Sequence, residues 1–380
     1  MQLLLIMVSE VPMKRIPALV ATIIILLLTL TGCSLNNKLT SANGVTHPNY
    51  YEIELSDFTR GRVEYLGLLS EDSILYYDPS SRRTDYYIYN FSTRENRKVG
   101  EIDNYYLDVS SATLLNDSVY FYIAQQQGSQ LKNILCQINP DSNTLNIIEK
   151  EDSSLPGLYI YTLGDGVITL KNERVEQYIT TYLDIYHPSE NRWEKHNVNV
   201  YDSEKISGSA LYVHYADGET LYTIEDRYEG DTCNSYLVTY DQKLQQKNNI
   251  QISGELLSFM NERRINGLYL WDDYIYVKNI ANDAFIGYID GDEIKKVFAA
   301  PTLLLCGSLT HNNSPVFYTH SGNTFYSIDE NARQVQSYTT KDVYHFIWAL
   351  SSPQHLVLIT NHDENGPKQM YLEKKDLQFL

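Results

Sequence analysis

One repeated pattern dominates the chain from Tyr50 onward: an alternating apolar strand, a polar turn and a second short strand. In several copies a further strand-like run precedes the pattern after an acidic or polar turn, as at 116–122, 165–170 and 272–277. Runs of this kind, bounded by Asp, Asn, Gly, Ser or Pro, are typical of short antiparallel strands. No long helical periodicity interrupts them, so the sequence predicts an all-β chain.

The copies recur at a nearly constant interval. In the six clearest copies the last apolar residue before the turn is Tyr89, Ile138, Tyr186, Tyr240, Ile289 and Ile328. The intervals between these residues are 49, 48, 54, 49 and 39. A seventh, more divergent unit consists of 355–359 and 369–372. Units of this length with four short strands are typical of β-propeller blades, and the chain resembles propellers as a class.

A closed ring gives a physical reason for the repetition. A four-stranded blade cannot bury both of its faces alone, whereas a ring of blades leaves no face unmatched. Residues 51–380 number 330, or about 47 for each of seven blades, and six or eight blades are the alternatives. We therefore predict an all-β propeller of seven blades, each of four antiparallel strands. Tyr51–Leu55 could pair with the last blade and close the ring, or Leu377–Leu380 could complete that blade.

The alternative fold is an irregular pair of β-sandwiches. Specific propeller families are less well matched than the architecture itself. The segment 183–193 resembles a kelch hairpin, but the chain lacks the paired glycines of kelch repeats and the Trp-Asp dipeptide of WD40 blades. The sequence therefore indicates the propeller architecture without indicating one functional family.

The first 33 residues have the three parts of an export signal. Lys14 and Arg15 precede an apolar core, Ile16–Leu30, whose 15 residues would form a helix only about 22 Å long, short of the roughly 30 Å hydrocarbon layer. The core ends in Leu30-Thr31-Gly32-Cys33, which resembles the lipobox of bacterial lipoprotein precursors. The resemblance implies cleavage after Gly32 and a diacylglyceryl group on Cys33, and two acyl chains hold a protein stably to a bilayer.

These features divide the chain into three parts. Residues 1–32 are expected to be the signal peptide, and Met13 is a more conventional start than Met1, so that 1–12 would not be translated. Residues 33–50 are the lipidated cysteine and a polar tether, whose 34–49 segment would span roughly 20–25 Å. Residues 51–380 are the propeller. The expected location is the cell membrane, on its extracytoplasmic face, with an uncleaved signal anchor as the alternative.

Composition limits the partners. The net charge is −18, and residues 1–32 carry +1, so the remaining chain carries −19. That charge argues against binding to nucleic acid and against direct adhesion to anionic lipid. We therefore expect the protein to be attached to the membrane through the lipid on Cys33 alone. Cys136, Cys233 and Cys306 are far apart and form no C-x-x-C pair, which disfavours a disulfide framework and a metal cluster. We interpret them as small apolar core residues.

Tyrosine is the strongest compositional bias, with 33 copies against 10 phenylalanines. Its apolar ring and polar tip suit half-buried strand positions, so packing within and between sheets is the preferred interpretation. Exposed rings that bind a glycan are the alternative interpretation.

The sequence contains no recognisable catalytic signature. It has no Gly-x-Ser-x-Gly elbow, Walker loop, Gly-x-Gly-x-x-Gly or His-Glu-x-x-His motif, and its nine histidines are scattered. Two acidic clusters, 225–231 and 290–293, do not match a calcium loop and are interpreted as solvated turns. We therefore predict no catalytic residue, no metal site and no cofactor. The sequence favours a protein that is not an enzyme.

Ligand binding in a propeller is expected where the innermost strands open into the central channel, and the innermost strand comes first in each blade. The residues near its start that we predict to face a ligand are Tyr106, Tyr159, Arg264 and His345. A glycosidase would need carboxylates that converge there, and those nearby in sequence are Asp108, Glu262 and Asp342.

The sequence therefore supports a membrane-anchored extracytoplasmic lipoprotein that acts as a non-catalytic binding or scaffold module for a protein, a peptide or a glycan. The alternative is an extracytoplasmic carbohydrate-active enzyme, a glycosidase or lyase, on the same scaffold. A sensory or accessory subunit of a membrane complex is a third candidate.

Overall fold

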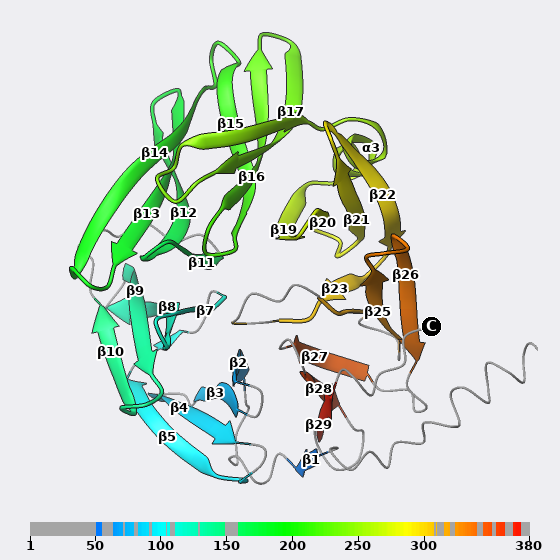
Figure 1. Cartoon of the computed structure of the whole chain (residues 1–380). Helices are drawn as coiled ribbons and strands as arrows, with labels where there is room; N and C mark the ends of the chain where they lie inside the picture. The colour runs from blue at the N-terminus through cyan, green and yellow to red at the C-terminus, as the bar shows by residue number, and fades with distance from the viewer. Residues whose placement is uncertain are drawn as a thin grey trace, which may run out of the picture.

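The computed structural model describes residues 51–54, 64–70, 73–79, 83–90, 93–103, 105–106, 111–127, 130–148, 159–307, 309, 315–319, 324–339, 345–351, 355–361 and 368–373. Its strands form seven antiparallel blades arranged in a ring (Figure 1). The sequence prediction of an all-β, seven-bladed propeller is confirmed, and the β-sandwich alternative is wrong. The signal segment, Cys33 and the tether lie outside the described residues, so their roles stay predictions.

From the centre outward, the strands of each blade follow chain order, except that the outer strand of blade 7 comes from the start of the chain. Blade 1 consists of β2 (Glu64–Ser70), β3 (Ser73–Pro79), β4 (Arg83–Asn90) and β5 (Asn96–Asp103). Blade 2 consists of β6 (Tyr105–Tyr106) and β7 (Thr113–Leu115), which both pair with β8 (Ser118–Gln127), followed by β9 (Gln130–Asn139) and β10 (Thr144–Ile148). Blade 3 consists of β11 (Ile160–Leu163), β12 (Gly166–Val175), β13 (Tyr178–His187) and β14 (Arg192–Asp202).

The remaining blades follow the same order. Blade 4 consists of β15 (Ser207–Ala216), β16 (Leu221–Glu229), β17 (Thr232–Tyr240) and β18 (Gln246–Gln251). Blade 5 consists of β19 (Ile265–Trp271), β20 (Tyr274–Asn279), β21 (Ala284–Asp290) and β22 (Glu293–Ala300). Blade 6 consists of β23 (Leu303–Leu305), β24 (Phe317–Thr319), β25 (Thr324–Asp329) and β26 (Gln334–Thr339). Blade 7 consists of β27 (His345–Ser351), β28 (His355–Asn361), β29 (Lys368–Glu373) and, from the other end of the chain, β1 (Tyr51–Glu54).

The ring is closed by strands from opposite ends of the chain. Strand β1 pairs antiparallel with β29, with Tyr51 opposite Tyr371 and Glu54 opposite Lys368. The first strand therefore becomes the outer strand of blade 7, as one of the two sequence alternatives predicted. Leu377–Leu380, the other alternative, lies outside the described residues.

The repeat seen in the sequence corresponds to the third strand of each blade. The six marker residues occupy the last or next-to-last position of β4, β9, β13, β17, β21 and β25, immediately before the turn into the outer strand. The widest interval, from Tyr186 to Tyr240, arises because β14 and β15 are long and pair with each other through Tyr201 and Asp202. That pairing joins blades 3 and 4 into one eight-stranded sheet, whose hairpins project from the ring (Figure 1).

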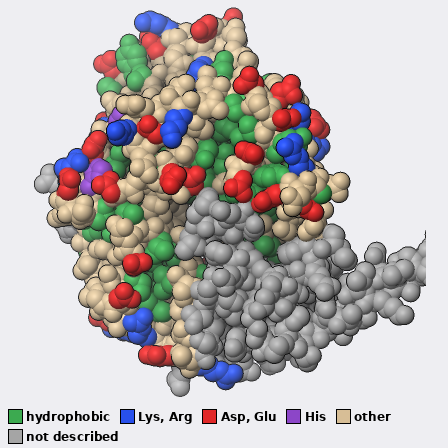
Figure 2. Space-filling model, in the orientation of Figure 1, with side chains coloured by type: hydrophobic (Ala, Val, Ile, Leu, Met, Phe, Trp, Pro, Cys, Tyr) green, Lys and Arg blue, Asp and Glu red, His purple; other side chains and the backbone are tan. Residues whose placement is uncertain are grey.

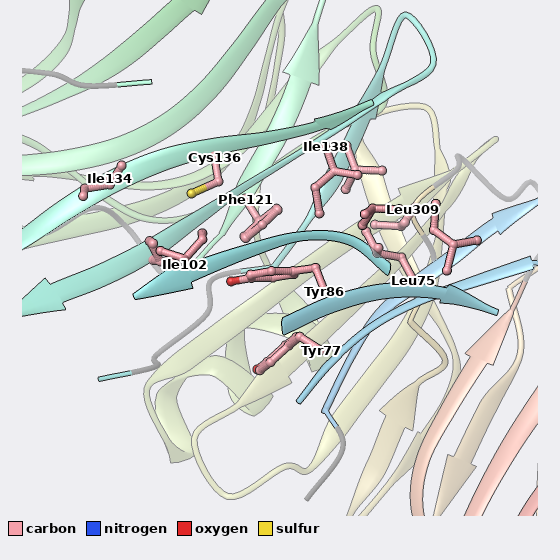
Figure 3. Packing of buried hydrophobic residues seen from close by; sticks show 13 residues of the cluster. Leu75, Tyr77, Tyr86, Ile102, Phe121, Ile134, Cys136, Ile138 and Leu309 are labelled. Carbon is pink, nitrogen blue, oxygen red and sulfur yellow. The ribbon is translucent and has the colours of Figure 1, made fainter. Parts of the chain in front are cut away.

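Apolar side chains fill the space between neighbouring blades. The second strands are buried on both faces; in β20, for example, Tyr274, Ile275, Tyr276 and Val277 are all buried. Because alternate residues of a strand point to opposite faces, such a run supplies the core on both sides of its blade. Figure 3 shows the cluster between blades 1 and 2, where Leu75 and Tyr86 meet Phe121 and Cys136. Burial of this kind contributes about 1.5–3 kcal/mol for each large apolar side chain.

The outer strands differ because one of their faces meets solvent. Most residues of β10 and β18 are exposed, and Figure 2 shows acidic and basic side chains interspersed over the visible face. The helix that the structure describes, α3 (Gly254–Glu262), connects blades 4 and 5 and packs against β21 and β22. Within the described part of the chain, no helix combines the length and apolarity that a bilayer span needs.

Two expectations from the sequence need correction. Cys136 and Cys306 are buried core residues as predicted, but Cys233 is exposed because it lies near the start of β17, on a projecting hairpin. In the first acidic cluster, Glu225 is buried rather than solvated. Strand β16 continues through this residue, and its carboxylate accepts hydrogen bonds from the hydroxyls of Tyr240 (2.6 Å) and Thr223 (2.9 Å).

Candidate functional site

A cavity of about 880 Å³ lies at the inner strands of blades 2 to 6. Its wall includes residues of β7, β11, β15, β19 and β23, the innermost strands that Figure 1 shows around the centre of the ring. This volume is within the range of about 300–1,000 Å³ that is usual for small-molecule sites. The cavity is therefore the candidate site for a ligand.

Tyrosine is the characteristic residue of the described cavity wall. Tyr161, Tyr215 and Tyr269 come from the inner strands β11, β15 and β19 of three successive blades. The rings of Tyr161 and Tyr215 meet edge to face with centroids 5.4 Å apart, and those of Tyr215 and Tyr269 lie 4.7 Å apart. Tyr159 stacks on Tyr161 at 6.4 Å. Aromatic pairs at these separations hold one another in place, so the wall is a fixed surface.

Further tyrosines come from the second strands of blades 5 and 6. Tyr276 of β20 donates a hydrogen bond from its hydroxyl to the carbonyl oxygen of Leu303 at 2.9 Å, and Tyr318 of β24 also lines the cavity. The ring of Tyr276 packs on Phe317 with centroids 5.3 Å apart. The hydroxyl of Tyr276 thus fixes the contact between two blades, while its ring forms part of the wall.

Burial keeps these hydroxyls protonated. Desolvation raises the pKa of Tyr159, Tyr161, Tyr215 and Tyr276 above the ordinary tyrosine value. For Tyr215 the nearby Tyr269 adds to the effect on the pKa, in part through a hydrogen bond. Tyr215 and Tyr276 are buried, so the partly exposed rings of the wall are those of Tyr159, Tyr161 and Tyr269. Neutral phenols both donate and accept hydrogen bonds, so these rings offer apolar faces with uncharged polar tips.

Two charged side chains belong to the described wall, Asp217 and Lys278. Asp217 lies in the turn after β15, and its Oδ1 accepts the backbone N–H groups of Glu219 (2.9 Å) and Thr220 (2.8 Å). Its Oδ2 accepts the hydroxyl of Tyr222 at 3.1 Å. Lys278 lies on β20, and desolvation by burial lowers its pKa below the ordinary lysine value. The carboxylate of Asp217 is therefore engaged in hydrogen bonds with its own turn and with Tyr222, whereas the ammonium group of Lys278 is partly desolvated.

The four residues predicted from the sequence lie in, or directly before, the first strands of their blades. Tyr159 directly precedes β11 and lines the cavity. Arg264 directly precedes β19, but it is exposed and is not part of the cavity wall. Tyr106 ends β6 and His345 begins β27, and their side chains lie outside the described part of the structure.

The carboxylates predicted to accompany them do not form a described cluster. Glu262 is exposed at the end of α3, and Asp108 and Asp342 are outside the described residues. Among the described residues, no group of three or more His, Cys, Asp or Glu side chains could hold a metal ion.

Sequence reasoning missed most of the cavity wall, although one signal was present. Tyr161, Tyr215 and Tyr269 are separated by 54 residues and again by 54, and each lies a few residues before an Asp-containing turn. A repeat aligned on the inner strands, rather than on the third strands, would have selected them. Lys278 carries no such signal, because it follows the apolar run of a second strand.

Comparison with known proteins supports the fold of this chain but does not assign it to a family. No family model and no curated protein matches the chain. A puromycin-hydrolysing peptidase of Mycobacterium tuberculosis is similar over 84% of this chain and 52% of its own, with 8% identity and a TM-score of 0.51. An oligogalacturonate lyase in complex with manganese is similar over 86% of this chain and 91% of its own, with 11% identity and a TM-score of 0.50. An α-L-arabinofuranosidase of Fusarium graminearum has 9% identity over 72% of this chain and 96% of its own, with a TM-score of 0.44.

The similarities to the peptidase and the lyase agree with the architecture derived from the strands. The chain is a seven-bladed β-propeller with a tyrosine-lined central cavity. At identities of 8% and 11% the peptidase and the lyase support the fold alone, because one fold hosts many unrelated activities.

Proposed function

We propose that this propeller binds an oligosaccharide in its central cavity. The observation that carries the proposal is the wall of fixed tyrosine rings, in which Tyr159 stacks on Tyr161. Sugar rings have apolar faces and a rim of hydroxyl groups. Aromatic rings with neutral hydroxyls complement both, because each tyrosine offers an apolar face and a polar tip.

The proposed setting is the outer surface of the cell membrane, where Cys33 would hold the propeller through a lipid. The resemblance of Leu30–Cys33 to a lipobox supports this setting. A propeller on a short tether would then meet glycans outside the cell while staying attached to it.

Cleavage of the bound glycan is the second candidate function. Titratable groups whose pKa values are shifted by burial and that line a cleft are typical of catalytic sites, and the cavity wall contains several. A lyase that acts on oligogalacturonate shares the fold, which favours a carbohydrate-active enzyme over a purely non-catalytic scaffold.

Glycan binding is tested with Tyr159→Ala. Loss of one stacking ring should weaken oligosaccharide binding about 10- to 100-fold, equivalent to roughly 1.5–3 kcal/mol. Isothermal titration with a panel of neutral and acidic oligosaccharides measures the change. Tyr178→Ala is the matched control, because Tyr178 is an exposed tyrosine on a hairpin away from the cavity wall.

The two candidates are separated by their products. Chromatography of the same oligosaccharides after long incubation should show shortened chains only if the protein is an enzyme. If no oligosaccharide binds, or if Tyr178→Ala weakens binding as much as Tyr159→Ala, the cavity is not a glycan site.

A further inference from the structure

Lys278 reaches the cavity although it lies on the second strand of its blade. It belongs to β20, which is separated from the channel by the inner strand β19. The pairing of β19 with β20 shifts register between Ile265 and Gly267, and Gly267 lies opposite Lys278. Both Gly267 and Lys278 line the cavity.

Gly267 provides the space that lets the lysine side chain cross the inner strand. A Cβ atom at position 267 would lie 3.2 Å from Cβ and 3.3 Å from Cε of Lys278. The lysine stem therefore lies against the backbone of Gly267 along its length. A side chain at this point of the bulge would require the lysine stem to shift by a few tenths of an ångström, so the glycine lets the stem lie directly against the inner strand.

This cation has no compensating charge among the described side chains. Burial accounts for the lowered pKa of Lys278, with no contribution from a carboxylate in the described part of the chain. Asp217, the carboxylate of the same described wall, already accepts three hydrogen bonds from its own turn and from Tyr222. A partly desolvated ammonium group costs free energy that an anion in the cavity would offset.

We propose that the cavity recognises a carboxylate group of its ligand through Lys278, which makes the ligand an acidic oligosaccharide that contains uronic acid residues. The proposal rests on the glycan-binding function proposed above and adds the substrate class. The tyrosine rings contact the sugar faces, and the ammonium group pairs with the carboxylate.

Two ligand series test the charge without changing the protein. The full chain in detergent is titrated with oligogalacturonates, oligomannuronates and hyaluronan fragments, and with the methyl esters of the same oligomers. At least one acidic series should bind, and its ester should bind about 10- to 100-fold more weakly, as expected for loss of a charge-assisted contact.

Protein variants locate the effect. Lys278→Met should weaken binding of the acidic oligomer about 10- to 100-fold and weaken binding of its ester by a much smaller factor. Lys243→Met, which removes the same charge from an exposed turn, should change neither. Gly267→Ala keeps the charge and displaces the stem, so it should weaken binding of the acidic oligomer by a smaller factor.

The outcomes distinguish this proposal from the one on which it rests. If neutral oligosaccharides bind and Lys278→Met has no effect, glycan binding stands and the acidic ligand is wrong. If esters bind as tightly as acids, the acidic ligand is also wrong. If neither acidic nor neutral oligosaccharides bind, both proposals fail.

Discussion

At the scale of single residues, the fold keeps the imidazole of His214 in its neutral form. Its imidazole lies between blades 3 and 4, is 5% exposed and meets the ring of Tyr161 edge to face with centroids 5.3 Å apart. Its Nε2 atom has no hydrogen-bond partner among the described atoms. Burial lowers the pKa of His214 to about 4, since the charged form would lose its hydration without gaining a partner.

This pKa predicts a specific loss of stability in acid. The unfolded chain binds a proton at His214 near pH 6.5, whereas the folded chain binds it only near pH 4. The free energy of unfolding should therefore fall as the pH is lowered from 6.5 towards 4, by about 3 kcal/mol from this residue. The loss is complete below pH 4, where both states are protonated.

Denaturant unfolding at several pH values measures this contribution. A His214→Phe variant should lose the His214 part of the slope between pH 6.5 and 4. His196→Phe, at a less buried position, should keep it. Equal slopes for the parent protein and His214→Phe would show that His214 titrates alike in the folded and unfolded chains.

At the scale of elements, the long hairpins of blades 3 and 4 depend on one glycine. Gly208 has a φ of +100°, and a Cβ atom there would lie 2.2 Å from the carbonyl oxygen of Val200. Because Gly208 pairs with Tyr201, this close approach is the point at which β14 and β15 join two blades into one sheet. A side chain at this position would force the two backbones apart.

Substitution of this glycine should cost more than an unfavourable φ alone. Gly208→Ala should lower the free energy of unfolding by about 3 kcal/mol, because it adds a backbone clash to the strain of a positive φ. Gly230→Ala is the matched control, since Gly230 has a φ of +61° and a Cβ atom there would meet nothing within 4 Å. It should cost only about 1 kcal/mol. If thermal or denaturant unfolding shows the same loss of stability for Gly208→Ala and Gly230→Ala, the close approach of β14 and β15 contributes no additional cost.

The elements also show what sequence could and could not predict. The repeat interval of the blades could be recognised in the sequence because each third strand ends in an apolar residue before a polar turn. Both features depend on local residue chemistry. Glu225 was misinterpreted because an acidic run suggests a turn, and the partners that bury it, Tyr240 and Thr223, belong to strands paired in three dimensions. Lys278 was missed because its route to the cavity depends on the bulge at Gly267.

At the scale of the whole molecule, closure of the ring creates the site. Strand β1 completes blade 7 by pairing with β29, so the two ends of the domain hold the blades together. The cavity wall then draws on five blades, which contribute residues as distant in sequence as Ser111 and Tyr318. Such convergence is a property of the closed ring and cannot be seen in the order of residues along the chain. Of the two predicted residues whose side chains the structure describes, Tyr159 lies in the wall and Arg264 does not.

The most direct measurement is a crystal structure of the protein with a bound oligouronate. We expect sugar rings in the central cavity against Tyr159 and Tyr161, with a carboxylate within ion-pair distance of the Lys278 ammonium group. An oligouronate bound elsewhere on the propeller, with the cavity unfilled, would contradict both the glycan site and its acidic specificity.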